Sequence, residues 1–341
     1  MDGDMKKSIA FINPRVSTKN VGDFFIEDSV KRIIKYDPQS SVDIDPRKPL
    51  TENDINNINK CDAAIIVGTN LWYRNILKKN RWMITIDDLK KIKVSFIPFG
   101  VGATLHRGEN AAFDEESVAL LRRIHDQCEE ASVRDPKTFE MVKKTGIDNV
   151  RMTGCPTLYH SLKPSWKLKI IESNDVVVTA RKDQDNNFNG LLSELRKRNK
   201  RPILAAQKKK DLFCSRRRFP YLQQGPEVLY EFNVDPYLKL TERTFGAIGW
   251  RLHGNILHLA YGKPTVFFAN CSRIQSFCEA FSLPWIYAED GEKIQGRDLS
   301  ESVDHLLAAD IFSSFPFRYA EFYSEMAKFF ERNGIGHNLF Y

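Results

Sequence analysis

The segment with the strongest chemical signature is Gly249-Trp250-Arg251-Leu252-His253-Gly254-Asn255, which the pattern predicts to end a strand and open a helix. The first N–H groups of a helix lack intrahelical acceptors and lie at the positive end of its dipole, so such a position suits a phosphate. Arg251 adds a fixed cation, and His253 adds a group that exchanges protons near neutral pH. We therefore expect anion binding and proton transfer here, with a structural histidine as the alternative.

A second candidate segment, Asn20-Val21-Gly22-Asp23, follows the first predicted strand and opens an amphipathic helix. Gly22 permits a close approach of backbone to a ligand, and Asn20 and Asp23 can bind a hydroxyl or cap the helix. Helix capping alone is the structural alternative.

A third candidate segment, Ser132-Val133-Arg134-Asp135, places an arginine and a carboxylate where a strand becomes a helix. Arg134 can bind a carboxylate or a phosphate bidentately. The alternative is a structural Arg134–Asp135 pair with Asp135 as the helix N-cap.

Glycines and polar side chains also follow other predicted strands. Gly100 and Gly102 lie after a strand near residue 97, but no GxGxxG with an acid about 20 residues later occurs, so dinucleotide binding lacks support. Arg181, Gln207 and Arg273 each lie at or just beyond the carboxyl end of a predicted strand. We expect all five residues to bind substrate.

Short apolar runs alternate with helical patterns along the whole chain, which indicates buried parallel sheets. The first series covers 8–13, 24–36, 63–68, 94–99, 114–127, 131–133 and 136–146. The second covers 175–180, 190–199, 202–206, 228–232, 235–244, 246–249, 253–261, 265–269 and 272–282. The pattern lapses between 157 and 174. The sequence therefore predicts an α/β protein with two Rossmann-like, doubly wound domains facing a cleft, at 1–160 (acceptor side) and 175–315 (donor phosphate side), followed by a C-terminal helix at 316–341.

Composition narrows the class of protein. The 341 residues include 42% hydrophobic and 28% charged residues, enough apolar surface for a folded core. The six cysteines show no CxxC and the seven histidines no ligand spacing, so neither a metal nor a disulfide framework is expected. No apolar run reaches the ~18 residues of a membrane span, and the start resembles no signal peptide, which predicts a cytoplasmic protein.

The net charge of +7 is concentrated in residues 196–218, which hold eleven Lys or Arg and one acid, Asp211. This run can be a solvated face, or it can attract anionic lipids or a lipid-diphosphate sugar carrier, which would give peripheral contact with the inner face of the membrane. Nucleic acid is the least favoured partner, because no binding motif with interleaved aromatic residues accompanies the charge.

Taken together, these motifs resemble the polysaccharide pyruvyl transferase family over about residues 8–285. The resemblance rests on N-x-G-D near residue 20, S-V-R-D near 134, R-L-H-G-N-I and L-A-Y-G-K-P at 251–264, and S-R-I-Q-S-F at 272–277. It implies an architecture similar to glycosyltransferase B and phosphoenolpyruvate as the donor, with Arg134, Arg251 and His253 on donor-binding or catalytic positions and Leu252 contributing its backbone. Two features depart from the family pattern: Cys155-Pro156 replaces Asp-Pro, and the glycine-rich stretch near residue 68 is short.

The chemistry implied by the resemblance is ketal formation on sugar hydroxyls of a surface polysaccharide or its lipid-linked precursor. It needs a general acid, cations for the donor and a base. We assign His253 as the acid, Arg251 and Arg134 as anion-binding groups, and Asp23 or Asp135 as the base, with phosphoenolpyruvate as co-substrate and no cofactor.

Two alternatives remain. One is a sugar-nucleotide glycosyltransferase, which commonly holds the ribose with a glutamate beyond the phosphate helix. No acid occurs between Glu242 and Glu279, which argues against it. The other is a non-catalytic sugar-binding protein.

Overall fold

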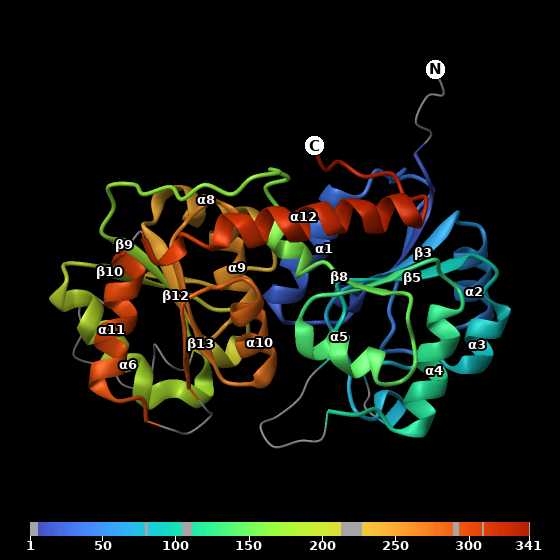
Figure 1. Ribbon diagram of the computed structural model, residues 1–341, viewed down its shortest axis with the longest axis horizontal. Coiled ribbons are helices and arrows are strands. Elements are labelled where there is room, and N and C mark those ends of the chain that lie inside the picture. Colours follow the sequence, from blue (N-terminus) through green and yellow to red (C-terminus); the bar gives the residue numbers. More distant parts are fainter. Residues whose placement is uncertain are drawn as a thin grey trace. The chain divides into compact units, whose positions relative to one another are not determined.

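The computed structural model describes residues 6–78, 81–103, 111–212, 227–288, 293–308 and 310–340 (Figure 1). The chain forms two compact units, one of Met1–Thr18, Ile26–Pro164 and Ala320–Tyr341, and one of Lys19–Phe25 and Ser165–Tyr319. The two units divide after Pro164, and residues 19–25, at the start of the first helix, belong to the second unit.

The first unit is built on a four-stranded parallel sheet with the order β2-β1-β3-β5. Its strands are β1 (Ile9–Ile12), β2 (Val42–Ile44), β3 (Ala63–Val67) and β5 (Ser95–Phe99). Two short parallel pairs accompany the sheet, β4 (Asn70–Trp72) with β6 (Gly102–Ala103) and β7 (Ala131–Val133) with β8 (Val150–Met152). Every residue of β1 and β3 is buried, as expected of parallel strands covered on both faces.

The helices of this unit are α1 (Val21–Ile33, whose first turn belongs to the second unit), α2 (Glu52–Asn59), α3 (Ile86–Lys91), α4 (Glu115–His125) and α5 (Pro136–Lys143). N-cap residues in the sequence explain where several of these helices begin. Thr51 and Thr85 each form a capping box with an aspartate three residues later. Asp114 caps α4 by accepting a hydrogen bond from the Ser117 N–H at 3.0 Å.

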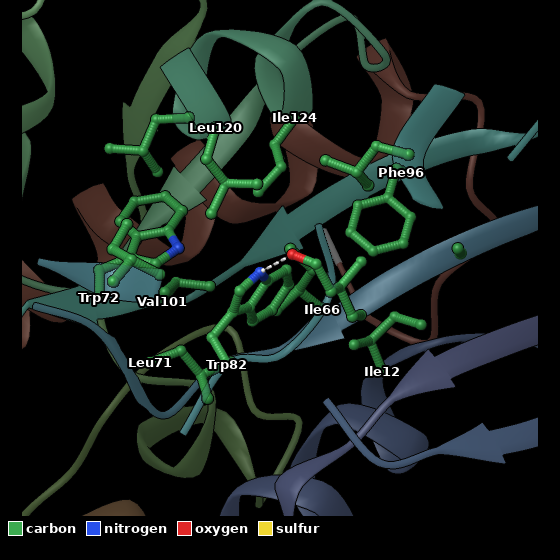
Figure 2. Packing of buried hydrophobic residues seen from close by; sticks show 14 of the residues in the cluster. Ile12, Ile66, Leu71, Trp72, Trp82, Phe96, Val101, Leu120 and Ile124 are labelled. Atoms are coloured by element: carbon green, nitrogen blue, oxygen red, sulfur yellow. Dashed lines mark hydrogen bonds between the residues drawn. The ribbon is translucent and has the colours of Figure 1, made fainter. Parts of the chain in front are cut away.

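The core of the first unit packs side chains of α4 and of the connecting segments against the sheet (Figure 2). Trp82 is fully buried beside Phe96, and its indole N–H donates to the carbonyl of Ile84 at 2.8 Å. Leu120 and Ile124, four residues apart on α4, complete this cluster with no exposed surface.

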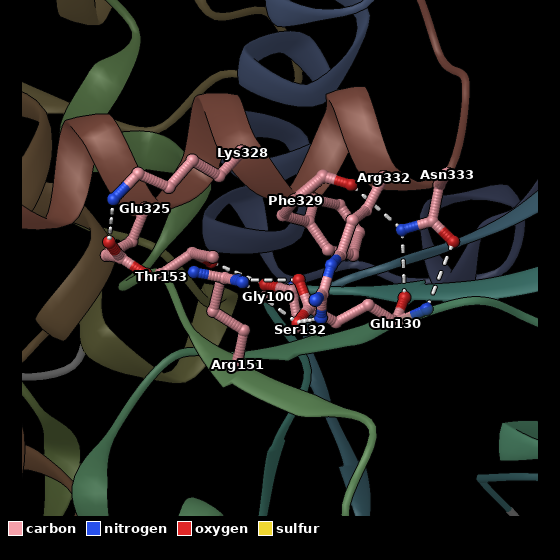
Figure 3. Close-up of polar contacts among 10 residues, drawn as sticks. All are labelled: Gly100, Glu130, Ser132, Arg151, Thr153, Glu325, Lys328, Phe329, Arg332 and Asn333. Carbon is pink, nitrogen blue, oxygen red and sulfur yellow. Dashed lines mark hydrogen bonds and ion pairs between the residues drawn. The ribbon is translucent and has the colours of Figure 1, made fainter.

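The C-terminal helix α12 (Phe315–Arg332) joins the first unit through the buried carboxylate of Glu130 (Figure 3). Arg151 donates to this carboxylate through Nε and Nη2 at 2.5 and 3.0 Å, and Arg332 donates to it at 3.1 Å. Arg151 also pairs with Glu325 on α12. Because Glu130 is only 4% exposed, we expect this ionic cluster to hold the second half of α12 firmly to β7 and β8.

The second unit contains a six-stranded parallel sheet with the order β11-β10-β9-β12-β13-β14. The strands are β9 (Asp175–Thr179), β10 (Arg201–Ala205), β11 (Glu227–Leu229), β12 (Gly246–Gly249), β13 (Thr265–Ala269) and β14 (Trp285–Tyr287). Counted within the unit, this is the doubly wound order 3-2-1-4-5-6. The strand order reverses between β9 and β12, so their carboxyl ends form the position where such sheets bind ligands.

Both faces of this sheet are covered by helices, namely α6 (Asp185–Lys197), α8 (Asp235–Arg243), α9 (Leu252–Ala260), α10 (Ser272–Ala280) and α11 (Gly296–Leu307). Alternation along β9 shows the two faces: Val176 and Val178 pack with α6 and α11, whereas Val177 packs with α8 and α9. The α/β fold of two Rossmann-like domains that the sequence predicts is therefore confirmed. Among the described residues, no helix is long and apolar enough to cross a membrane.

The basic segment does not form one continuous patch in its described part. Residues 196–201 lie before and at the start of β10, whereas residues 207–212 follow the end of that strand. Arg198 pairs with Glu194 and Asp304, and Arg201 pairs with Asp175, so these cations already have protein partners. Residues 213–218 lie outside the described part of the chain.

Candidate functional site

The junction between β12 and α9 is held by a buried polar network. Gly249 has a φ of +141°, a conformation that other residues rarely adopt. The side chain of Asn255 donates to the Gly249 carbonyl at 2.9 Å and accepts from the Thr179 hydroxyl at 2.8 Å. Thr179 also accepts from the Arg251 N–H at 3.2 Å. These contacts fix the start of α9 against the end of β9, at the reversal of strand order.

The first turns of α1 and α9 meet at this edge of the sheet. A Cβ atom added at Gly22 would lie 2.8 Å from Gln207 Oε1 and 3.0 Å from His253 Nδ1. Gly22 and His253 are both the second residue of their helices, and the Val21 N–H donates to the Gln207 carbonyl at 2.9 Å. Two helix N-termini, each a partial positive charge, therefore converge on Gln207.

Gln207 carries a hydrogen-bond donor that no described residue accepts. Its side chain is 2% exposed, and its Nε2 has no hydrogen-bond partner among the described residues. A Cβ atom at Gly254 would collide with this amide nitrogen, so the glycine makes room for it. A buried unsatisfied donor costs about 1–3 kcal/mol, which a ligand that accepts the hydrogen bond would recover.

The guanidinium of Arg251 already pairs with a carboxylate, so Arg251 does not present an unpaired cation to an anionic ligand. Its Nε donates to Asp211 Oδ2 at 2.9 Å, and its Nη2 pairs with Asp211 Oδ1. Asp211 is fully buried and also accepts from the backbone N–H groups of Gln207 and Lys208 at 3.3 and 2.9 Å. The carboxylate offsets the charge of Arg251, so only Nη1 of this guanidinium remains without a hydrogen bond in the described structure.

Arg273, unlike Arg251, has no acidic partner among the described residues. It lies in the first turn of α10, after β13, and is half-buried. Its Nε is buried without a hydrogen-bond partner, and it forms no ion pair within the described ranges. Arg181, directly after β9, is also half-buried, and Leu252 is the first residue of α9 with 4% exposure. These three residues and Gln207 lie at carboxyl ends of the same sheet, as the sequence predicts.

Asn20 and Asp23 lie in or next to the first turn of α1. Asn20 donates through Nδ2 to Asp23 Oδ1 at 3.1 Å, and the Asp23 N–H donates to the Asn20 carbonyl at 3.0 Å. Asp23 is 7% exposed. The carboxylate is therefore in the same unit as His253 and in the helical turn that contacts it.

The remaining predicted residues lie in the first unit. Asp135 caps α5: its Oδ1 accepts from the Thr138 N–H at 2.9 Å and its Oδ2 from the Thr138 hydroxyl at 2.8 Å. Arg134 is 1% exposed, with Nε 3.9 Å from Asp135, and its guanidinium occupies the space where a Cβ at Gly102 would be. A Cβ atom at Gly100 would lie 2.5 Å from Pro156 Cδ. These contacts match the structural alternative for Asp135 and leave the substrate-binding roles as predictions.

Sequence reasoning missed the residues that organise the site. Asp211 was visible as the one acid in the basic segment, but only the fold brings it to Arg251. Asn255 was part of the Gly249–Asn255 segment but received no role, and Thr179, in a predicted strand, was not singled out. In the described ranges no three His, Cys, Asp or Glu side chains come together as metal ligands.

Comparison with solved structures shows the fold. The S. aureus MnaA protein solved with UDP has a TM-score of 0.52 at 11% identity, covering 92% of each chain. The UDP-GlcNAc 2-epimerase of Methanocaldococcus jannaschii has a TM-score of 0.53 at 10% identity, covering 95% of this chain and all of the other. A putative UDP-N-acetylglucosamine 2-epimerase from Listeria monocytogenes has a TM-score of 0.52 at 11% identity, covering 95% and 96%.

Comparison with curated protein sequences gave no significant match. The sequence model of one family, the polysaccharide pyruvyl transferases, matches residues 20–272, which is most of the chain and includes Asn20, Gly22, Gln207 and the 249–255 segment. The chain therefore belongs to the polysaccharide pyruvyl transferase family.

Proposed function

We propose that this protein transfers pyruvate from phosphoenolpyruvate onto hydroxyls of a saccharide, forming a cyclic ketal. The observation that carries the proposal is the buried Nε2 of Gln207, which has no hydrogen-bond partner among the described residues and lies between the first turns of α1 and α9. A donor held between two positive helix ends favours an anion. Phosphoenolpyruvate carries both a phosphate and a carboxylate, and Arg273 and Arg181 lie at the same sheet edge to receive the second group.

In the proposed reaction His253 protonates the methylene carbon of phosphoenolpyruvate. One sugar hydroxyl then attacks the resulting oxocarbenium-like carbon and releases its proton to a base. The bond between this carbon and the phosphate oxygen then breaks and phosphate leaves. A second hydroxyl adds to the same carbon and closes the ring, and its proton passes to the released phosphate. The two helix N-termini and the arginines at this edge of the sheet stabilise the departing phosphate.

Asp23 is the better candidate for the base. It lies in the helical turn of Gly22, whose added Cβ would come within 3.0 Å of His253. Asp135 is in the other unit, and both of its carboxylate oxygens already accept hydrogen bonds from Thr138. A base must be within hydrogen-bond reach of the hydroxyl that it deprotonates, which favours the carboxylate that lies in the same helical turn as Gly22.

The donor site is tested by replacing Gln207 with leucine and titrating phosphoenolpyruvate by calorimetry. Loss of a hydrogen bond to a charged group should weaken binding by about 10–100-fold. Gln275→Ala is the control, because that side chain donates only to Glu279 on the surface of α10. Unchanged affinity in Gln207→Leu would place the donor elsewhere.

The chemical step is tested with His253→Ala. Donor affinity should stay near that of the wild type, whereas phosphate release in the presence of acceptor glycans should fall by ~10²–10⁴, the usual contribution of a positioned acid. If turnover and its pH profile do not change, His253 is a structural residue at the start of α9.

We also propose that the acceptor is presented at the cytoplasmic face of the membrane and that the basic segment contacts anionic lipids there. The paired cations at residues 196–201 restrict this contact to the part of the segment beyond β10. Flotation with anionic vesicles at low salt should recover the protein, and added salt should release it. Absence of flotation at low salt would rule the contact out.

A further inference from the structure

Two buried side chains hold one peptide unit of the loop after β10, the unit that joins Ala206 to Gln207. Its N–H donates to Asp211 Oδ2 at 3.3 Å, and its carbonyl accepts from the hydroxyl of Tyr237 at 3.0 Å. Asp211 is fully buried and Tyr237 is 2% exposed. Because a peptide unit is planar, fixing both of its polar ends fixes the orientation of the plane to which the Gln207 Cα is attached.

The hydroxyl of Tyr237 has both of its hydrogen-bonding functions occupied. Tyr237 lies in the first turn of α8, and its oxygen accepts from the Glu231 N–H at 3.2 Å while its O–H donates to Ala206. Burial raises the pKa of this hydroxyl well above its usual range, so it remains a donor across the neutral range. The contact with the loop therefore depends on a single O–H group, which phenylalanine lacks.

The ring of Tyr237 also contacts the helix that carries Gly22. Phe25 packs edge-on against it, with 4.9 Å between the ring centroids and an angle of 71° between the planes. Phe25 follows Gly22 by three residues in α1, and residues three apart are neighbours on the surface of a helix. One side of α1 therefore meets Tyr237 through Phe25 and Gln207 through Gly22.

The side-chain amide of Gln207 fits closely between two glycines. A Cβ atom added at Gly22 would lie 2.8 Å from its Oε1, and one added at Gly254 would lie 2.4 Å from its Nε2. A rotation of the Ala206–Gln207 peptide unit would move the amide out of this space. A glutamine that is not held in place loses rotamer freedom when a ligand binds, which corresponds to about 3–10-fold in affinity.

We propose that Tyr237 is a positioning residue of the donor site, because its hydroxyl fixes the peptide unit from which the Gln207 amide reaches the donor. Without the hydroxyl, the Ala206 carbonyl and the Glu231 N–H lose this partner, and the Asp211 carboxylate holds the peptide unit from its N–H end alone. The inference rests on the proposed function, since Tyr237 affects the donor only through Gln207.

A double-mutant cycle tests this dependence. Tyr237→Phe, Gln207→Leu and the double variant are titrated with phosphoenolpyruvate by calorimetry. Tyr237→Phe should weaken binding about 3–10-fold when Gln207 is present and should change nothing further when residue 207 is leucine. With acceptor glycans present, Tyr237→Phe should raise the KM for phosphoenolpyruvate and keep kcat within about twofold of the wild type, because the acid His253 is untouched.

Tyr159→Phe is the matched control. The buried Tyr159 hydroxyl also donates to a backbone carbonyl, that of Thr153 at 2.8 Å, but it does so in the first unit. Both variants should lower the urea midpoint, whereas only Tyr237→Phe should weaken phosphoenolpyruvate binding. A general loss of stability would affect the two variants alike.

The outcomes separate the inference from the proposed function. Where Gln207→Leu weakens binding, an unchanged affinity in Tyr237→Phe, or an equal loss in both backgrounds, overturns the inference alone. Unchanged affinity in Gln207→Leu overturns the donor site and the inference with it. If Tyr237→Phe does not fold, Phe25→Leu replaces it in the same cycle, since it removes the ring that packs against Tyr237, and it should weaken binding only where Gln207 is present.

Discussion

Replacing Asp211 with alanine should be one of the most damaging single changes in the second unit. The fully buried carboxylate accepts from Gln207 N, Lys208 N and two nitrogens of Arg251. Its removal leaves the Arg251 cation, which is 13% exposed, without a counter-charge and leaves two backbone N–H groups unsatisfied. Breaking a buried ion pair from one side typically costs about 3–5 kcal/mol, and we expect the free energy of unfolding to fall by that amount.

Urea unfolding followed by tryptophan fluorescence measures this loss, because Trp250 is adjacent to Arg251. Asp304→Ala is the matched control. Asp304 also accepts from two nitrogens of an arginine, Arg198, but it is 60% exposed, so its removal should cost less than about 1 kcal/mol.

The double variant Asp211→Leu/Arg251→Met tests whether Asp211 and Arg251 stabilise the fold as an ion pair or independently of one another. Replacing both charges with apolar groups of similar volume should recover much of the stability that Asp211→Leu alone loses, because no buried charge remains unpaired. Additive losses, or an Asp211→Ala variant within 1 kcal/mol of the wild type, would refute the reasoning.

Three further predictions follow from buried contacts. Gly22→Ala should lower affinity for phosphoenolpyruvate about tenfold, since the new methyl group displaces Gln207; Gly296→Ala, with open space at its Cβ, should not. Burial depresses the pKa of His258 from 6.5 to about 4, so the unfolded state binds more protons across that range. His258 should therefore contribute a loss of stability of about 3 kcal/mol as the pH drops from 6.5 to 4, and His258→Leu should reduce this slope in urea titrations. Glu130→Ala should cost about 2–4 kcal/mol in urea unfolding, because it leaves Arg151 without its main partner; a loss below 1 kcal/mol would contradict this.

Local patterns were enough to predict most of the elements around the site. The strand over 246–249 and the strand over 265–269 were predicted with the bounds that the structure shows, because short apolar runs between glycine or proline and polar residues leave little choice. The helix after the Gly249–Asn255 segment begins at Leu252, one residue before the predicted start. The short strand Val42–Ile44 and the helix Glu52–Asn59 were not predicted, since each has too few apolar residues for a clear period.

The partners of the site residues were less predictable. Arg251 was correctly placed at the end of a strand, but its pairing with Asp211 spans forty residues and depends on how the loop after β10 folds back. The same holds for Gly22, whose need to be small comes from Gln207 and His253, both more than 180 residues away in the sequence. Such contacts depend on the tertiary fold and cannot be inferred from the spacing of residues along the chain.

The central claim is that the edge formed by the first turns of α1 and α9 binds phosphoenolpyruvate. Thermal unfolding of the wild type, recorded while phosphoenolpyruvate or UDP-GlcNAc is titrated, tests it most directly, since a ligand at 100 times its Kd stabilises the folded state by about 2.7 kcal/mol. We predict saturable stabilisation by phosphoenolpyruvate, which needs about 10–100-fold more ligand in Gln207→Leu, and a smaller or absent shift with UDP-GlcNAc. Stabilisation by UDP-GlcNAc with none by phosphoenolpyruvate would contradict the account.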